Sequence, residues 1–137
     1  MSNQLSLDEL LSLAGKVSVW ESKWDSESGD DWYHSSRSYR GHVEDISVVV
    51  THYDYRTYYT SKWGSNRVDK KEGFMIYVSV GRVFSGEGRK VESLYEKIER
   101  DYNEKQKKEQ ERLKDLQEKE NEARLLAALE KARKLAR

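Results

Sequence analysis

Cysteine and proline are both absent from this 137-residue chain. Without cysteine the protein can form no disulfide and has no thiolate for catalysis, so a reducing compartment is permitted. No apolar run approaches the ~20 residues that a membrane-spanning helix needs. Residues 1–13 also lack the basic start of a secretory signal peptide. These absences predict a cytoplasmic protein without a membrane partner.

Strongly apolar residues are scarce as well. Leu, Ile, Val and Phe together number 28 of 137, near the lower limit for globular folding. However, 13 of the 15 aromatic residues precede Gly88, so a modest core can form in that part. We therefore predict two parts, a small α+β domain at 1–102 and a charged helical extension at 103–137.

The net charge is zero, which removes the simplest argument for a nucleic-acid partner. The charges are nevertheless uneven along the chain. Residues 1–36 hold two lysines and seven acids, whereas residues 62–90 hold seven bases and three acids. This polarity could orient self-association, or it could belong to ordinary solvated loops.

A short amphipathic helix is predicted near the N-terminus. Ser6 and Glu9 have the spacing of a capping box, and Gly15 closes the pattern. We expect this helix to cover an open end of the core. Its apolar residues fall at i, i+3, i+4 and i+7: Leu7, Leu10, Leu11 and Ala14.

Five strands are expected in an antiparallel meander. The alternating stretch 16–24 is the first, and the acidic, Ser-rich residues 25–36 are expected to form a loop. The β-branched and aromatic run 46–59 is the central strand. It pairs with the strand before it through a two-residue turn, Glu44-Asp45, in a register that sets Val43 opposite Ile46 and Arg37 opposite His52.

The remaining strands follow a polar stretch. Residues 61–73 are expected to form a long crossover, because they hold few strand-forming residues. Residues 74–80 and 83–85 then form a second hairpin around a Gly81-Arg82 turn.

From Arg89 to Arg137 no residue argues against helix. Apolar residues from Val91 to Tyr102 form one stripe, whereas residues 103–112 contain no apolar side chain. Acid-before-base pairs at i, i+4 support the helix beyond that point. A helix of this length would span about 70 Å, so it should extend past the sheet. The fold class is therefore α+β: an antiparallel β-meander of about five strands with a short N-terminal helix and a long protruding C-terminal helix.

The helical extension has a second apolar surface, which we interpret as an oligomer or partner interface. Its residues are Leu113, Leu116, Leu125, Leu126, Leu129, Ala132 and Leu135. Three interpretations stay open: a coiled coil with a second copy, docking on another protein's helix, and a loosely formed helix. A membrane-surface role ranks below these, because the stretch is short and lacks Trp and Phe.

No catalytic motif was found, so the sequence does not indicate an enzyme. The three histidines are the only imidazoles for a metal site or a base, and the predicted register places His42 and His52 on opposite faces of the sheet. For an enzyme, a candidate catalytic base is needed, and the predicted register offers only one such group with a charged neighbour: His52, which lies beside Arg37. We predict no metal and no cofactor.

Two stretches could bind a ligand. Gly86, Gly88, Arg89 and Lys90, between a strand and a helix start, have the ingredients of an anion cradle, although a plain loop explains them as well. The other is an aromatic and basic set, which could stack the bases of single-stranded nucleic acid or a nucleotide-like anion, form a protein interface, or simply cover the sheet. Its residues are Arg37, Arg40, Tyr53, Tyr55, Arg56, Tyr59, Lys62, Trp63 and Arg67.

The function predicted from these features is a non-enzymatic protein-interaction or assembly module. It would oligomerise or dock through the C-terminal helix and present the aromatic and basic face of the sheet. The alternative is binding of single-stranded nucleic acid or a nucleotide-like anionic ligand by that face.

Overall fold

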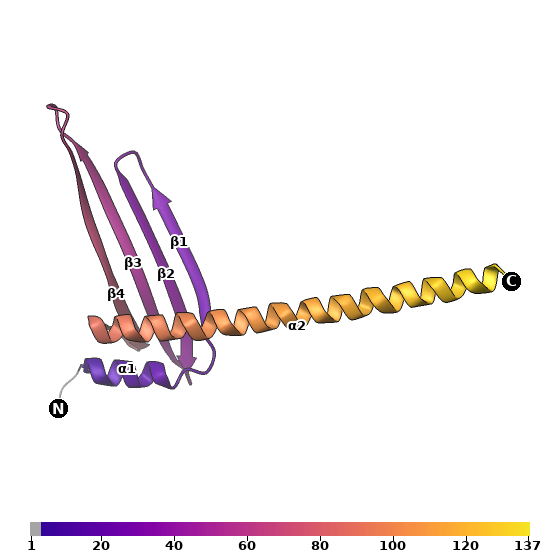
Figure 1. Cartoon of the computed structure of the whole chain (residues 1–137). Helices are drawn as coiled ribbons and strands as arrows, with labels where there is room; N and C mark the ends of the chain where they lie inside the picture. The colour runs from indigo at the N-terminus through magenta and orange to yellow at the C-terminus, as the bar shows by residue number, and fades with distance from the viewer. Residues whose placement is uncertain (1–3) are drawn as a thin grey trace. The chain divides into compact units, whose positions relative to one another are not determined.

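The structure, a computed structural model, describes residues 4–137 (Figure 1). It confirms the α+β class, with one five-stranded antiparallel sheet, a short N-terminal helix and a long C-terminal helix. The chain divides into two compact units, Met1–Arg100 and Asp101–Arg137, which are described separately. The elements are α1 (Leu7–Gly15), β1 (Glu21–Ser28), β2 (Trp32–Val43), β3 (Ile46–Thr60), β4 (Asn66–Val80), β5 (Arg82–Glu87) and α2 (Arg89–Leu135).

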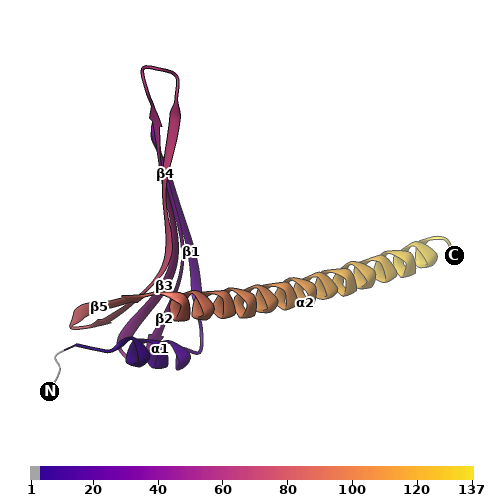
Figure 2. The same ribbon diagram turned by 60° about the vertical axis from the view of Figure 1, so that its left-hand side comes forward.

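The strands pair in chain order, each antiparallel to the next. The predicted β2–β3 register is confirmed, since Val43 lies opposite Ile46 and Arg37 opposite His52. Glu44 in the connecting turn has a φ of 56°, the left-handed conformation that such a tight turn requires. The β3–β4 hairpin is the longest, and Figure 2 shows it rising to its turn at residues 61–65.

The core of the first unit lies on one face of the sheet, which we call the helix-covered face. Because side chains alternate along a strand, β3 sends its even-numbered residues to this face and its odd-numbered residues to the other, the open face. The buried side chains of the core come from the sheet, from α1 and from the start of α2: Tyr39, Val48, Val50, Ile76 and Val78, then Leu10 and Ala14, then Val91, Tyr95 and Ile98.

Helix α1 forms as predicted. Ser6 Oγ accepts a hydrogen bond from the Glu9 backbone N–H, and the Glu9 carboxylate accepts one from the Ser6 N–H, which completes the capping box. The helix packs over Gly86 of β5, where a Cβ atom would come within 2.8 Å of Leu7 Cδ1. A bare backbone at this position therefore lets α1 approach the sheet closely.

The prediction for the first strand was wrong at its start. β1 begins at Glu21 rather than at Lys16, and the Val17–Trp20 segment is not in a strand. This segment lies over Gly41 of β2, where a Cβ would be 2.1 Å from Val17 Cγ1 and 3.2 Å from the Trp20 ring. Its apolar side chains alternate in the sequence, but packing on Gly41 takes the place of strand pairing.

Two expected loops are largely strand. β1 continues to Ser28 and β2 starts at Trp32, so only residues 29–31 connect them. β4 starts at Asn66, inside the expected crossover at 61–73, and β5 starts at Arg82, so the second hairpin turns at Gly81 (φ 73°) alone. All of β1 and residues 66–72 of β4 are exposed. Their backbones pair while neither face is buried, so the sequence shows no apolar alternation there.

The second unit consists of helix α2 from residue 101 to its end. Salt bridges join Glu109 to Arg112 (2.6 Å) and Glu120 to Arg124 (3.1 Å). No helix within residues 4–137 combines the length and apolar character needed to cross a membrane.

Candidate interaction surfaces

The structure divides the predicted aromatic and basic set between different places. Arg37 and Arg56 lie on the helix-covered face, and Lys62 and Trp63 lie in the β3–β4 turn. The set therefore does not form a single binding surface. The open face receives the other five residues: Arg40, Tyr53, Tyr55, Tyr59 and Arg67.

Both arginines of the set on the helix-covered face are engaged with carboxylates. The Arg37 guanidinium lies 3.7 Å from Glu99 Oε2. Arg56 donates two hydrogen bonds to Asp54, of 3.2 and 3.0 Å, and this carboxylate raises the pKa of Arg56. A phosphate at either guanidinium would have to compete with the carboxylate already there.

On the open face, Arg67 donates to Asp69 Oδ2 (3.3 Å) while its guanidinium lies 4.6 Å from the centre of the Tyr59 ring. Of the five predicted cations, only Arg40 and Lys62 have no carboxylate partner among residues 4–137. The basic character that phosphate binding needs is largely neutralised.

Four aromatic rings form a continuous row on the open face: Trp32, His34, Tyr55 and Tyr53. Their ring centres are 4.8, 4.4 and 5.3 Å apart in that order. Tyr53 lies over Gly73 of β4, where a Cβ atom would be 2.5 Å from the tyrosine oxygen. The sequence prediction missed His34, because it placed this residue in a loop. Extending the predicted β2–β3 register by three residues would have set His34 opposite Tyr55.

The surroundings of this aromatic row carry both signs of charge. Asp25 and Glu27 of β1 line a recess of about 160 Å³ beside His34 and Tyr55. On the other side of the row, Lys71 of β4 lies opposite Tyr55. A mixed rim around aromatic rings is typical of a protein interface and gives little attraction for a polyanion.

Three residues of the predicted anion cradle have structural roles in the fold. Gly88 (φ 120°) starts α2, since its carbonyl oxygen accepts hydrogen bonds from the N–H groups of Val91 and Glu92. Gly86 lies beneath α1, and Lys90 pairs with Asp8 at 3.2 Å.

The space beside Gly88 and Arg89 is a cleft of about 580 Å³ that is also lined by three carboxylates. They belong to Glu72, Glu87 and Glu92. Lys70 and then His52 lower the pKa of Glu72 through hydrogen bonds to its carboxylate, which favours its charged form. The local charge therefore opposes an anion.

The histidines lie apart. His52 stacks on Phe74 (4.6 Å between ring centres), and its Nε2 lies 2.9 Å from Glu72 Oε1. His42 belongs to the open face. Among the described residues there is no cluster of three or more His, Cys, Asp or Glu side chains that could hold a metal ion.

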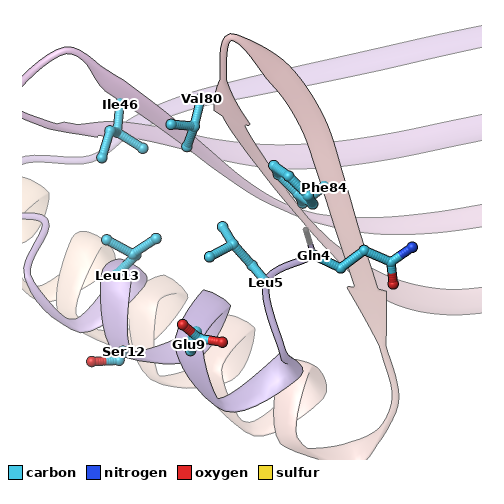
Figure 3. A pocket seen from close by; sticks show the side chains of 8 residues that line it. All are labelled: Gln4, Leu5, Glu9, Ser12, Leu13, Ile46, Val80 and Phe84. Atoms are coloured by element: carbon cyan, nitrogen blue, oxygen red, sulfur yellow. The ribbon is translucent and has the colours of Figure 1, made fainter. Parts of the chain in front are cut away.

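An apolar pocket of about 610 Å³ lies between α1 and the sheet (Figure 3). Ile46, Val80 and Phe84 come from the strands, and Leu5 and Leu13 come from the N-terminal segment and α1. Glu9, Ser12 and Gln4 complete the lining. Sequence reasoning missed this pocket, because it depends on how α1 lies against β4 and β5. The only signal was Leu13, an apolar residue outside the predicted stripe of the helix.

The apolar side chains of the second unit form two stripes on different sides of the helix. At about 100° per residue, the midline of Leu113 and Leu116 lies about 170° around the helix from that of Leu125 and Leu129. We call the pair Leu113 and Leu116 the first stripe. The second stripe consists of Leu125, Leu129, Ala132 and Ala136; Leu126 and Leu135 lie about 80° and about 100° from the midline of Leu125 and Leu129, on opposite sides. The predicted interface is thus two surfaces, of which the second is the broader.

Comparisons with known proteins give no match: no protein family, no curated protein and no solved structure resembles this chain.

Proposed function

We propose that this protein is a non-enzymatic interaction and assembly module that associates through the C-terminal part of α2. The observation that carries the proposal is the state of the leucines in the second unit. All six lie between 43% and 78% exposed: Leu113, Leu116, Leu125, Leu126, Leu129 and Leu135. A single helix cannot bury its own side chains, so these residues lose contact with water only against another surface.

The second stripe is the stronger candidate for that contact. Burying one leucine fully contributes about 1.5 to 3 kcal/mol, whereas association costs about 4 kcal/mol or more in lost freedom of motion. Leu125 and Leu129, together with Ala132 and Ala136 and with one flanking leucine, Leu126 or Leu135, can exceed that cost. The two leucines of the first stripe fall near or below it.

The open face of the sheet is the second surface of the proposed module. Its aromatic row consists of Tyr, Trp and His rings with mixed charges around them. Such rings often contribute most of the energy of protein–protein binding, because they bury a large area at little cost in side-chain entropy. We propose that a protein partner binds there.

Alanine substitution in the two stripes tests the association. Alanine is the best helix former, so Leu125→Ala with Leu129→Ala removes apolar surface without breaking the helix. We expect the full-length double variant to associate at least tenfold more weakly than the unsubstituted chain, measured by light scattering and sedimentation over a range of concentrations.

Two matched controls accompany this test. Glu130→Ala with Lys134→Ala changes the opposite side of the same turns and should leave the association constant nearly unchanged. Leu113→Ala with Leu116→Ala reports on the first stripe and should have a smaller effect. If the unsubstituted chain is monomeric at the highest concentration, self-association through the helix is wrong.

A second candidate function has one supporting observation. The aromatic row has the spacing of a stacking platform, so single-stranded nucleic acid or a nucleotide-like anion is the alternative ligand. Trp32 in the row provides a fluorescence signal for titration with oligonucleotide at low salt. We expect no saturable quenching, because three of the five predicted cations are paired with carboxylates and because Asp25 and Glu27 lie beside the row. Saturable quenching that disappears in Tyr55→Ala but persists in the exposed control Tyr58→Ala would favour the alternative.

A further inference from the structure

We infer that the apolar pocket of the first unit receives the C-terminal helix of a second copy of this chain. This inference rests on the proposed association through α2 and names the surface that the second stripe contacts. The pocket is a concave apolar surface, and the second stripe is a convex one whose leucines are exposed. The two surfaces can therefore fit together.

The charges of the two surfaces are complementary. Glu9 lines the pocket, and Glu44 and Asp45 directly precede the lining residue Ile46. One cation is also near, since the Arg82 guanidinium lies 4.8 Å from the centre of the Phe84 ring, so the surroundings are acidic on balance. By contrast, residues 123–137 hold five cations and one acid. A rim with more acids than bases attracts a basic helix and favours one orientation of the contact.

The chemistry of the lining suits an amphipathic helix. Five apolar side chains surround a volume of about 610 Å³; of the polar groups, Glu9 and Ser12 belong to α1, and Gln4 lies near Phe84. Leu125 and Leu129 are one turn apart, so both can enter one groove from the same side of a helix. This is the helix-in-groove mode of recognition, in which residues at i and i+4 act as anchors.

Pairing of the second stripe with itself is less favourable on electrostatic grounds. Two copies of residues 123–137 aligned with each other would each bring a net charge of +4 into contact. In a parallel pair the acidic segment 111–122 of one copy would lie beside the same acidic segment of the other copy. It would therefore not reduce the repulsion between the two basic segments. The pocket offers the opposite charge.

A contact between unlike surfaces can be reciprocal in a two-fold dimer, or it can leave one pocket and one helix unused in each pair and continue as a ring or an open chain. In each of these assemblies every contact needs one intact pocket and one intact helix. This requirement allows a complementation experiment with full-length chains. Val80→Lys blocks the pocket with a cation, and its side chain is 46% exposed, so the fold should tolerate it. Leu125→Ala with Leu129→Ala disables the helix.

Each variant alone should be monomeric, whereas an equal mixture should form a 1:1 dimer, since the pocket-blocked chain supplies a helix and the helix-disabled chain supplies a pocket. Val68→Lys, an exposed valine on the same strand outside the pocket, is the matched control and should assemble like the unsubstituted chain. Circular dichroism and urea titration of both lysine variants check the fold.

Cross-linking gives a second measurement that does not depend on blocking the pocket. The chain has no cysteine, so single substitutions are clean. Chains carrying Ser12→Cys in the pocket lining, mixed with tagged chains carrying Ala132→Cys, should form a mixed disulfide under mild oxidation. The pair Ser26→Cys and Ala132→Cys, with Ser26 on exposed β1, should form at least fivefold less.

The outcomes separate the two proposals. Assembly that survives Val80→Lys, with no excess of the Ser12–Ala132 disulfide, overturns the pocket while leaving association through the helix intact. Efficient Ala132→Cys homodimer formation in place of the mixed species would show that the helix pairs with itself, and would also overturn the pocket. A monomeric unsubstituted chain overturns both proposals.

Discussion

The two parts of α2 differ in what stabilises them. Residues 89–100 bury Val91, Tyr95 and Ile98 in the core of the first unit, and the Tyr95 ring lies 5.4 Å from the Tyr39 ring. Residues 101–137 have more leucines, yet none of them is buried. Apolar composition alone therefore does not predict burial. Packing against a second element decides it.

The comparison also separates two sources of helix stability. In the first part, tertiary packing holds the helix. In the second part, the stability of the helix comes from interactions within the helix itself: the intrinsic helix propensity of its residues and ion pairs such as Glu120–Arg124, which contribute about 0.2 to 0.5 kcal/mol each. Substitutions that remove one source should leave the other part nearly unaffected.

The largest effect is expected at Tyr95. Its ring contacts Tyr39, Phe74 and His52 with centres 5.3 to 5.7 Å apart. Tyr95→Ala should lower the free energy of unfolding of the first unit by about 3 to 5 kcal/mol, because it removes a large buried ring and leaves a cavity. Urea titration followed by tryptophan fluorescence measures this. Leu113→Ala, the control in the second unit, should change the value by under about 0.5 kcal/mol.

An intermediate effect should appear at alkaline pH. Burial and then the hydrogen bond to Glu99 raise the pKa of Tyr95 above its usual value of about 10. A raised pKa in the folded state means that stability is full below about pH 10 and falls as the pH rises above it, by up to about 1.4 kcal/mol per pH unit. Tyr95→Phe should flatten this fall. The exposed control Tyr58→Phe should not; if both variants flatten it equally, Tyr95 is not its source.

A smaller effect is expected from glycine in the second unit. Lys108→Gly should destabilise this part of α2 by about 1 kcal/mol relative to Lys108→Ala, because no packing compensates for the lost propensity. Hydrogen exchange should show faster exchange near residue 108 and no change in the first unit. Faster hydrogen exchange throughout residues 1–100 as well would mean that the two parts are coupled.

The parts of the fold that the sequence predicted are those in which burial imposes a pattern. The capping box of α1 and the β2–β3 register follow from short-range spacing and from alternation around Val48 and Val50. Two of the missed strand segments, the end of β1 and residues 66–72 of β4, have no buried face, and residues 32–35 of β2 are only partly covered. Their pairing is made by backbone hydrogen bonds, which any side chains permit.

The candidate surfaces were predicted less well. Five residues of the aromatic and basic set lie on the open face, but the set mixed them with Arg37 and Arg56, which lie on the opposite side of the sheet. The pocket beside α1 left only one sign in the sequence, the apolar Leu13 outside the helix stripe, since it arises where Leu13 and Phe84, distant in the chain, lie around an unfilled space. Such a feature depends on three-dimensional packing rather than on local spacing.

The register of the sheet runs without a bulge from β1 to β5, and this has a consequence for changes in chain length. Inserting one residue before Tyr53 would reverse the side of every later β3 residue, exchanging Tyr53, Tyr55 and Tyr59 with Asp54, Arg56 and Tyr58. An insertion of two residues would restore their sides and only displace them along the strand. Tolerance to insertions in this hairpin should therefore alternate between odd and even lengths.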